Sequence, residues 1–278
     1  MIETFIETWG MFRDTYLTAV FSGLLLASVG VLVVAQGQVF LAVAVAQASM
    51  LGVAVSLASG WGPPWVLAVG FSVGAALLTA GSRARDAHRR EETAAWVFLV
   101  ASSLTILLLA HQALGMKQVQ ALLASSLIGA TPGDALLYGL LAAASMVTLL
   151  VLRARLVLYL GDPVMAAAVG IPIAVWSLAI ATALGLVTGL SIHTSGLLFT
   201  FGCLTLPALV ARQWCRRAST LFLLAPAVCG LALVPGLVLA HAWDYPPGQV
   251  IVALLAAMLW LAWGGRWLMA RIEGGGGA

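Results

Sequence analysis

The sequence predicts an all-α membrane protein, with about nine transmembrane helices (range eight to ten) in one domain that spans residues 1–278. Hydrophobic residues make up 62% of the chain and charged residues only 8%, and the mean hydropathy is +1.07. A soluble domain carries about 25% charged residues. Because one water-soluble core of this size cannot hide so much apolar surface, lipid must be the solvent. This composition excludes a soluble enzyme and a nucleic-acid-binding domain.

Nine apolar runs are candidates for the spans, since a helix needs about 20 apolar residues to cross the hydrocarbon core. They are residues 15–35, 39–58, 65–81, 94–112, 135–152, 164–188, 196–211, 219–241 and 249–265. Residues 113–133 are expected to hold at most a partial helix within the membrane. The C-terminal Gly274–Ala278 segment is expected to be a flexible tail.

The basic residues predict the orientation. Eleven of the 13 Lys and Arg residues fall in four clusters that nine spans place on one side: Arg83, Arg85, Arg89 and Arg90; Arg153 and Arg155; Arg212, Arg216 and Arg217; Arg266 and Arg271. Only Arg13 and Lys117 fall on the other side. The positive-inside rule therefore predicts an outside N-terminus and a cytoplasmic C-terminus.

The charged residues also limit the chemistry. A phosphate-binding P-loop needs a lysine within a glycine-rich pattern, and the only lysine, Lys117, does not fit it. This chain is therefore not expected to hydrolyse ATP. All ten acidic residues lie in loops or near span ends, which weakens a proton- or sodium-coupled interpretation.

Three histidines and one aspartate fall near the predicted outer ends of spans: His111, His193, His241 and Asp134. Imidazole and carboxylate groups are good ligands for divalent cations, so these residues are candidates for an outer metal-attracting vestibule. No two of them share a short ligand-like spacing. The alternative is that they are interfacial side chains bonded to water or lipid headgroups.

Proline and glycine mark two kinds of packing feature. Pro207 follows an apolar run and precedes a short basic stretch, and it is expected to kink or break the helix there. The pairs Gly70/Gly74 and Gly185/Gly189 have the four-residue spacing that allows close helix approach. We expect both pairs to serve packing within the chain, and the alternative is a contact between two copies of the chain.

Three segments resemble the membrane permeases of zinc/manganese-type ABC importers. Val45–Ala54 resembles that family's Ala-His-Ala-Ser-Leu-x-Gly-Val-Ala segment, and Gly196–Arg212 resembles its segment ending in Pro-Ala-Ala-Thr-Ala-Arg. Tyr245–Gly248 and the following span match its final Pro-x-Gly turn and helix. The order is kept along nearly the whole chain, and weaker similarity around 130–134 keeps the segments in register.

The resemblance implies a type II-like ABC importer permease in the bacterial inner membrane, with no cofactor on this chain. It implies two ATPase subunits that use ATP and Mg²⁺, a second permease copy and an extracytoplasmic metal-binding protein. It also implies that Ala208–Arg217 forms the coupling element that docks on the ATPase. The residues expected to take part are Pro207, Ala208, Leu209, Ala211, Arg212, Trp214, Arg216 and Arg217.

The chain departs from the family at two positions. Gln47 stands where the family usually has His, and Ser126 where it commonly has Asp. By the resemblance, the path candidates are Gln47, Ser49, Ser126, Cys203 and Thr205. Gln47 can equally serve a hydrogen bond between helices, and a buried cysteine such as Cys203 is more often inert packing.

The leading hypothesis is therefore the permease of an ATP-driven importer for zinc or manganese. An ABC permease for a metal chelate or another small solute is an alternative, because Gln47 and Ser126 replace the better metal ligands. A stand-alone secondary transporter or channel is a second alternative, although acidic residues within the spans would be expected for it.

Overall fold

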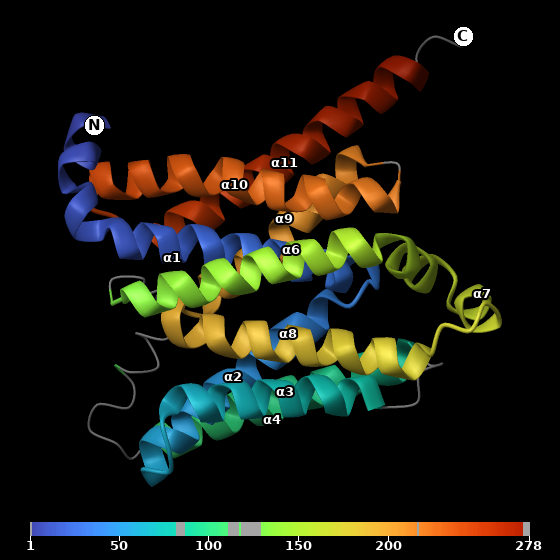
Figure 1. Ribbon diagram of the computed structural model, residues 1–278, viewed down its shortest axis with the longest axis horizontal. Coiled ribbons are helices and arrows are strands. Elements are labelled where there is room, and N and C mark those ends of the chain that lie inside the picture. Colours follow the sequence, from blue (N-terminus) through green and yellow to red (C-terminus); the bar gives the residue numbers. More distant parts are fainter. Residues whose placement is uncertain (1, 82–86, 111–116, 118–128, 216, 275–278) are drawn as a thin grey trace.

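The chain is folded as one helical bundle in the computed structural model, which describes residues 2–81, 87–110, 117, 129–215 and 217–274 (Figure 1). Every regular element in that part of the chain is a helix. The helices are α1 (Ile2–Ala35), α2 (Val39–Ser59), α3 (Pro64–Gly81), α4 (Ala87–Ala110), α6 (Pro132–Gly161), α7 (Pro163–Ala168), α8 (Ile173–Ser195), α9 (Leu197–Trp214), α10 (Ala218–Trp243) and α11 (Pro247–Gly274).

The described helices confirm the predicted number of spans. Nine of them are long and apolar enough to cross a membrane. The spans run over Phe12–Ala35, Val39–Ser59, Pro64–Gly81, Arg89–Ala110, Pro132–Gly161, Ile173–Ser195, Leu197–Trp214, Ala218–Trp243 and Pro247–Trp267. The partial helix expected within 113–133 lies largely outside the described residues. Gly274, the first residue of the expected tail, is the last residue of α11, and the rest of the tail lies outside the described residues.

The expected span 164–188 is wrong at its start, because the structure divides this region into α7 and α8. Gly170 has a φ of 85°, a left-handed conformation that stops a helix and that glycine adopts readily. Pro172 then stands at the N-cap of α8, where its fixed φ and missing N–H group cost least. Continuous hydrophobicity across residues 164–188 concealed this turn.

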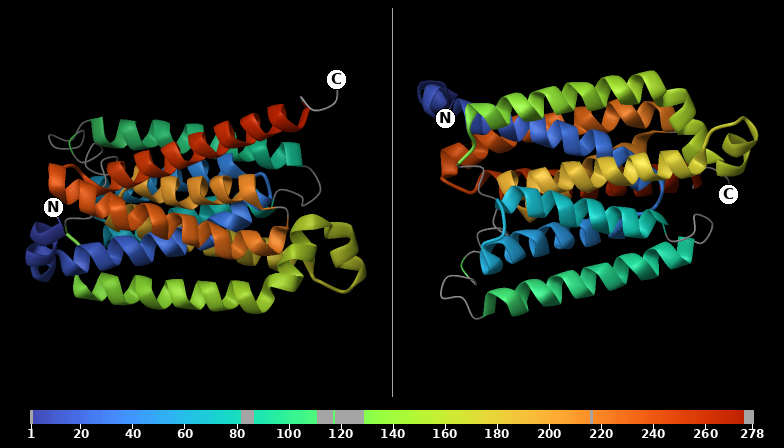
Figure 2. Two further views of the ribbon diagram at one scale, coloured as in Figure 1. Left: turned by 90° about the horizontal axis from the view of Figure 1, so that it is seen from above. Right: turned by 60° about the horizontal axis from the view of Figure 1, so that its bottom comes forward.

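α1 lies at the centre of the bundle. Its span is 78% buried, whereas that of α6 is only 17% buried, so α6 belongs to the periphery. α1 contacts α6, α8, α9 and α10, and the views in Figure 2 show the helices running side by side along one axis. α2 occupies a second inner position, between α3 and α4.

Glycines set two of the closest helix crossings. A Cβ atom at Gly30 of α1 would lie 1.7 Å from the carbonyl oxygen of Leu204 in α9, which no side chain can satisfy without a backbone shift. Gly185 and Gly189 bring α8 against α3 in the same way, and the Ser72 hydroxyl donates to the Gly185 carbonyl oxygen at 2.7 Å. Such small-residue contacts let backbones approach closely in lipid.

The expectation for the other glycine pair is wrong. Cβ atoms at Gly70 and Gly74 would have no heavy atom within 4 Å. Both glycines line an apolar groove of about 410 Å³ between α3 and α4, with Ala48 and Leu51 of α2 also in its lining. α3 and α4 each pack closely on α2 but touch one another little, so this pair does not mark a helix contact within the chain.

The crossing of α1 and α9 yields a prediction that can be checked with a matched pair of variants. Gly30→Ala should destabilise the protein by about 1–3 kcal/mol, because the added methyl group overpacks the crossing. Gly74→Ala should be neutral or slightly stabilising, since its site is open and alanine favours a helix over glycine by about 1 kcal/mol. The apparent unfolding temperature in detergent measures both effects. Equal unfolding temperatures for the two variants would contradict the crossing geometry.

Candidate translocation and coupling sites

The helix that carries the expected coupling segment is continuous. α9 begins after Gly196, whose φ is 79°, and runs through Pro207 to Trp214. The helix therefore does not break at Pro207, and the other half of the expectation, a kink there, stays a prediction. A proline within a membrane helix is tolerated where neighbouring helices enclose the freed backbone groups, and α1, α10 and α11 all pack against α9.

The last two turns of α9 have an inner and an outer face. Pro207, Ala208 and Ala211 are buried, whereas Arg212 and Trp214 are exposed. Ala208 and Ala211 belong to a buried cluster, here called the basal core, that joins α1, α6, α8, α9 and α10. Its other buried members are Val31, Leu32 and Val34 of α1, Leu149, Leu156 and Tyr159 of α6, Ile180 of α8, and Leu221, Phe222 and Ala225 of α10. The end of α9 is thus fixed firmly to the rest of the bundle.

Of the remaining coupling candidates, Leu209 lies within α9 and Arg217 is the N-cap of α10. Leu209 is partly buried against the basal core and Arg217 is exposed, while Arg216 lies outside the described residues. A hollow of about 670 Å³ opens beside the turn between α9 and α10, lined by Trp214, Cys215, Arg217, Thr220, Leu223, Leu224 and Ala227. The Arg266 guanidinium of α11 donates to the Gln213 side-chain oxygen at 3.1 Å. These contacts form a surface with apolar walls and cationic edges.

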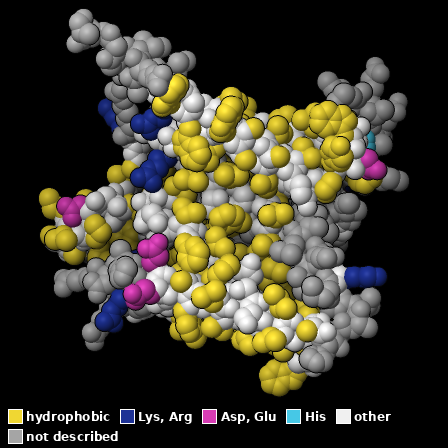
Figure 3. Space-filling view, turned by 180° about the vertical axis from the view of Figure 1, so that it is seen from behind, with side chains coloured by type: hydrophobic (Ala, Val, Ile, Leu, Met, Phe, Trp, Pro, Cys, Tyr) yellow, Lys and Arg dark blue, Asp and Glu magenta, His cyan; other side chains and the backbone are white. Residues whose placement is uncertain are grey.

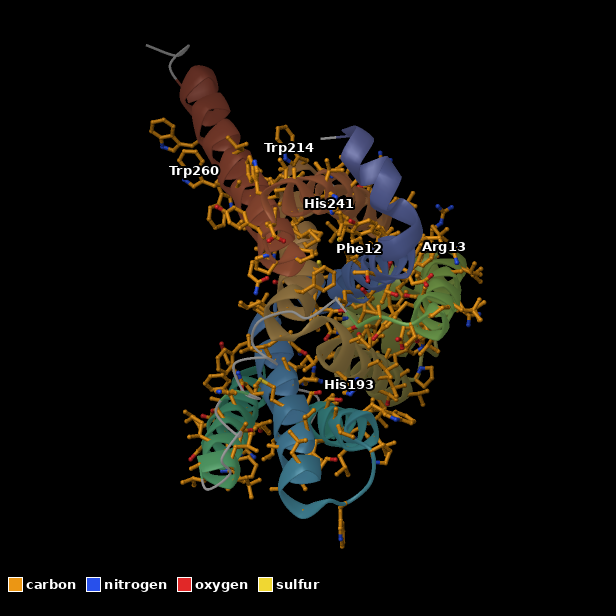
Figure 4. The ribbon with its side chains drawn as sticks, turned by 90° about the vertical axis from the view of Figure 1, so that its left-hand side faces the viewer. Phe12, Arg13, His193, Trp214, His241 and Trp260 are labelled. Atoms are coloured by element: carbon orange, nitrogen blue, oxygen red, sulfur yellow. The ribbon has the colours of Figure 1, made fainter. Side chains whose placement is uncertain are left out.

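The described basic side chains of the four clusters belong to one end of the bundle. In Figure 3 most Lys and Arg side chains in view lie toward that end, and hydrophobic side chains cover the band between the ends. Arg13, labelled in Figure 4, lies near the start of α1, which Figure 1 shows at the opposite end of the bundle. This distribution is the one that the sequence predicted for a protein inserted with its basic loops on one side.

The path candidates do not share one environment. Gln47 is half-buried in α2, and Ser49 is fully buried with no hydrogen-bond partner for its hydroxyl. Thr205 donates to the Phe201 carbonyl oxygen of its own helix at 2.8 Å. Ser126 lies outside the described residues.

Cys203 is enclosed by its own chain. It is fully buried in the main hydrophobic cluster together with Cys229 of α10, and the Cys229 thiol donates to the Gly23 carbonyl oxygen at 3.4 Å. These neighbours favour the packing interpretation of Cys203 over a place on a path.

Asp134 has a structural task at the N-terminal end of α6. Its Oδ2 atom accepts from the Thr131 backbone N–H at 2.8 Å and from the Thr131 hydroxyl at 2.7 Å. The Thr131 hydroxyl in turn accepts from the Asp134 N–H, which completes a capping box. A capping box satisfies N–H groups that have no partner within the helix, so Asp134 stabilises the helix start.

The histidines do not meet. The His241 Nδ1 atom is 3.1 Å from the Tyr16 hydroxyl, and its ring stands edge-on to Phe12 and Tyr16. His193 is exposed near the end of α8, apart from His241 in Figure 4. His111 lies outside the described residues. Within the described ranges no three His, Cys, Asp or Glu side chains come together to hold a metal ion.

The structure adds polar contacts that the sequence reasoning missed. The Tyr138 hydroxyl of α6 hydrogen-bonds the Thr194 hydroxyl of α8 at 2.7 Å, although Tyr138 is only 1% exposed. Buried tyrosine hydroxyls usually find a partner, so an isolated tyrosine in an apolar run was the available signal. Two more buried hydroxyls, besides that of Ser49, have no hydrogen-bond partner: those of Thr18 and Thr188.

The nine candidate spans found in the described residues and the one-sided basic end (Figure 3) define a multi-pass membrane protein. A sequence profile of the ABC 3 transport family matches residues 9–264. The chain belongs to the ABC 3 transport family, and this confirms the resemblance found in its sequence segments. It is accordingly a transport protein of the ABC class. Comparison with curated protein sequences returns no match.

Solved structures share the fold. The chain is similar to PsaBC from Streptococcus pneumoniae in complex with a Fab, with a TM-score of 0.79, 20% identity and coverage of 94% of this chain and 95% of that one. It is also similar to an inward-facing structure described as a metal-chelate type ABC transporter, with a TM-score of 0.71, 18% identity and coverage of 92% and 88%. At these identities the likeness concerns the fold alone.

The capping role of Asp134 can be separated from a metal-binding role. Asp134→Ala should lower stability by about 1 kcal/mol through loss of the cap. Asp134→Asn keeps an oxygen that can accept both Thr131 bonds and should retain nearly all of that stability. Thermal unfolding of the two variants beside the parent protein provides the measurement. If asparagine destabilised the protein as much as alanine, the carboxylate charge would matter beyond capping.

Proposed function

We propose that this protein is the membrane permease of an ATP-driven importer for a divalent metal ion, with zinc or manganese as cargo. The observation that carries the proposal is the family match over 9–264, together with the three sequence segments that resemble zinc/manganese-type permeases. The absence of a P-loop from the sequence assigns ATP hydrolysis, with its Mg²⁺, to separate subunits. Import, rather than export, follows from the resemblance.

The proposal assigns the coupling role to the basic end of α9. Transmission of force from an ATPase requires a rigid element at the membrane face. Ala208 and Ala211 anchor α9 in the basal core, while Arg212, Trp214 and Arg217 face outward. The hollow beside Trp214 offers room for a protruding element of an ATPase subunit. A push on this end is therefore passed directly to α1, α6, α8 and α10.

The complete transporter consists of two permease copies, two ATPase subunits and an extracytoplasmic metal-binding protein. It lies in the bacterial inner membrane with the basic end of the bundle in the cytoplasm, as the positive-inside rule requires. The N-terminus of the chain is then outside and the C-terminus inside. Cargo delivered from outside passes between the two permeases, with Gln47, Ser49, Ser126 and Thr205 as the path candidates of each copy.

A metal chelate is the second candidate cargo. Gln47 offers only a neutral oxygen or nitrogen where the resembling family has an imidazole, and neutral oxygen ligands hold zinc weakly. One structure with the same fold is described as being of the metal-chelate type. A chelated ion keeps its ligands and would not need new ones from the permease.

The two candidate cargoes are distinguished by which of them stimulates ATP hydrolysis in the reconstituted complex. If the leading proposal holds, zinc or manganese with the binding protein should raise ATPase activity severalfold, whereas an iron chelate should leave it at the basal rate. The measurement is phosphate release from proteoliposomes that contain permease, ATPase and binding protein. Stimulation by the chelate, with no response to either bare ion, would replace the first cargo by the second.

The coupling assignment is tested with two arginines from the same end of the bundle. Arg212→Ala should lower cargo uptake per ATP at least tenfold, because it alters the outward face of the α9 end. Arg155→Ala removes an equally basic and exposed side chain from α6, outside the coupling segment, and should leave that ratio unchanged. Uptake and phosphate release are measured on the same vesicles. An unchanged ratio for Arg212→Ala would remove the coupling segment from this role.

A further inference from the structure

A cavity of about 120 Å³ lies at the basic end of the bundle, among the ends of α1, α2, α3 and α4 and the first half of α8. It is separate from the groove between α3 and α4 and from the hollow beside Trp214. Its described lining contains none of the path or coupling candidates. The proposed function therefore gives this cavity no role.

Polar and apolar groups line different levels of the cavity. Gln36 and Gln38 lie in the turn between the first two spans, and Arg90 lies at the start of the fourth. Together with Glu91 they form a polar mouth at the level of a membrane boundary. Inside the spans the lining is mostly apolar and includes Val33, Ile180, Ala181 and Leu184. A molecule that fills the cavity must therefore have a polar head and an apolar body.

Two polar side chains of the lining have no partner in the part of the chain that the structure describes. Ser177 is only 8% exposed, yet its hydroxyl does not bond the carbonyl group one turn earlier, as those of Ser28 and Thr105 do. The half-buried Arg90 guanidinium forms neither a hydrogen bond nor an ion pair within the described ranges. Buried polar groups are rarely left unpaired, so both point to an occupant with acceptor oxygens.

Water satisfies only one part of this cavity. A buried water makes about three hydrogen bonds, which the polar mouth offers and the apolar interior does not. Sites for whole drug-sized ligands measure about 300–1,000 Å³. A cavity of about 120 Å³ therefore holds one part of a larger amphiphile, whose remainder stays in the surrounding bilayer.

The charges at the polar mouth select the head group of that amphiphile. Arg90 and Glu91 are neighbours on α4, and both line the cavity. A guanidinium group pairs well with phosphate, and a carboxylate accepts from an ammonium group. Basic pockets between membrane helices are common sites for lipid head groups. A phospholipid with an amine in its head group matches both charges, whereas a purely anionic one would set its charge beside Glu91.

We propose that this cavity binds one phospholipid of the phosphatidylethanolamine class. Arg90 binds the phosphate, Glu91 accepts from the ammonium group, and Ser177 donates to an ester oxygen below the phosphate. The first methylene groups of one acyl chain pack against Ile180 and Leu184. The bound lipid links α4 to α1 and α8, which α4 contacts little in the described chain. The site belongs to the membrane protein itself and does not depend on the cargo.

Native mass spectrometry of the full-length protein in detergent tests the proposal. The probes are dioleoyl phosphatidylethanolamine, the matching phosphatidylglycerol and inorganic phosphate. Phosphatidylethanolamine should occupy a single site, with a Kd about tenfold lower than that of phosphatidylglycerol, and inorganic phosphate should not displace it. Equal affinities for the two lipids would overturn the proposed head group. Displacement by inorganic phosphate would show a site for a free anion and overturn the lipid.

Three variants assign the affinity to the cavity. Arg90→Gln should raise the Kd for phosphatidylethanolamine about tenfold, because the phosphate loses its cationic donor. Glu91→Gln should abolish the preference for phosphatidylethanolamine over phosphatidylglycerol. Arg155→Gln removes an exposed arginine of α6 outside the cavity and should bind like the parent protein.

Thermal unfolding separates loss of binding from loss of folding. Without lipid the three variants should unfold at the temperature of the parent protein, because the substituted side chains are exposed or half-buried. Added phosphatidylethanolamine should raise that temperature for the parent protein and Arg155→Gln, but not for Arg90→Gln. If Arg90→Gln bound and responded like the parent protein, or if Arg155→Gln lost as much affinity, the cavity would not be the lipid site.

Discussion

The contact between Gly30 and the carbonyl group of Leu204 determines how the centre of this bundle is built. It lets α1 and α9 cross backbone to backbone, one turn before Pro207. From this crossing α9 continues to the basic end, where Ala208 and Ala211 enter the basal core. Because hydrocarbon offers no water to unpaired backbone groups, the freed groups near Pro207 must be enclosed by neighbouring helices. Because α1 approaches α9 so closely, it helps to enclose these backbone groups. This enclosure explains why α9 remains one continuous helix.

A continuous α9 changes the mechanical picture that the sequence suggested. A helix broken at Pro207 would let the coupling segment swing separately from its span. The observed α9 instead runs from the membrane interior into the segment as one continuous helix, and the basal core ties it to α1, α6, α8 and α10. A force applied at the basic end of the bundle therefore moves several helices together. This arrangement suits a permease that alternates between discrete states, because packed cores shift between arrangements rather than deform gradually.

Hydropathy was sufficient to predict the nine spans, because lipid demands long apolar helices and leaves few other solutions. Hydropathy failed where tertiary packing or backbone geometry determines whether a helix stops or continues. The positive φ of Gly170 and the cap at Pro172 split one predicted span, and packing against α1 overrode the breaking tendency of Pro207. The capping role of Asp134 was readable from Thr131 three residues earlier. The separation of His193 from His241 could not be predicted from the sequence, since the two side chains belong to different helix contacts that only the fold reveals.

A separate ATPase is expected to drive this permease, and a transport measurement on the permease alone tests this most directly. Vesicles containing only this protein, loaded with a metal-sensitive dye, should take up neither zinc nor manganese above the leak of empty vesicles, even under a proton or sodium gradient. Addition of the ATPase subunit and the binding protein, with ATP enclosed on the ATPase side, should start uptake. Gradient-driven uptake by the isolated permease would contradict the account and identify the protein as a secondary transporter.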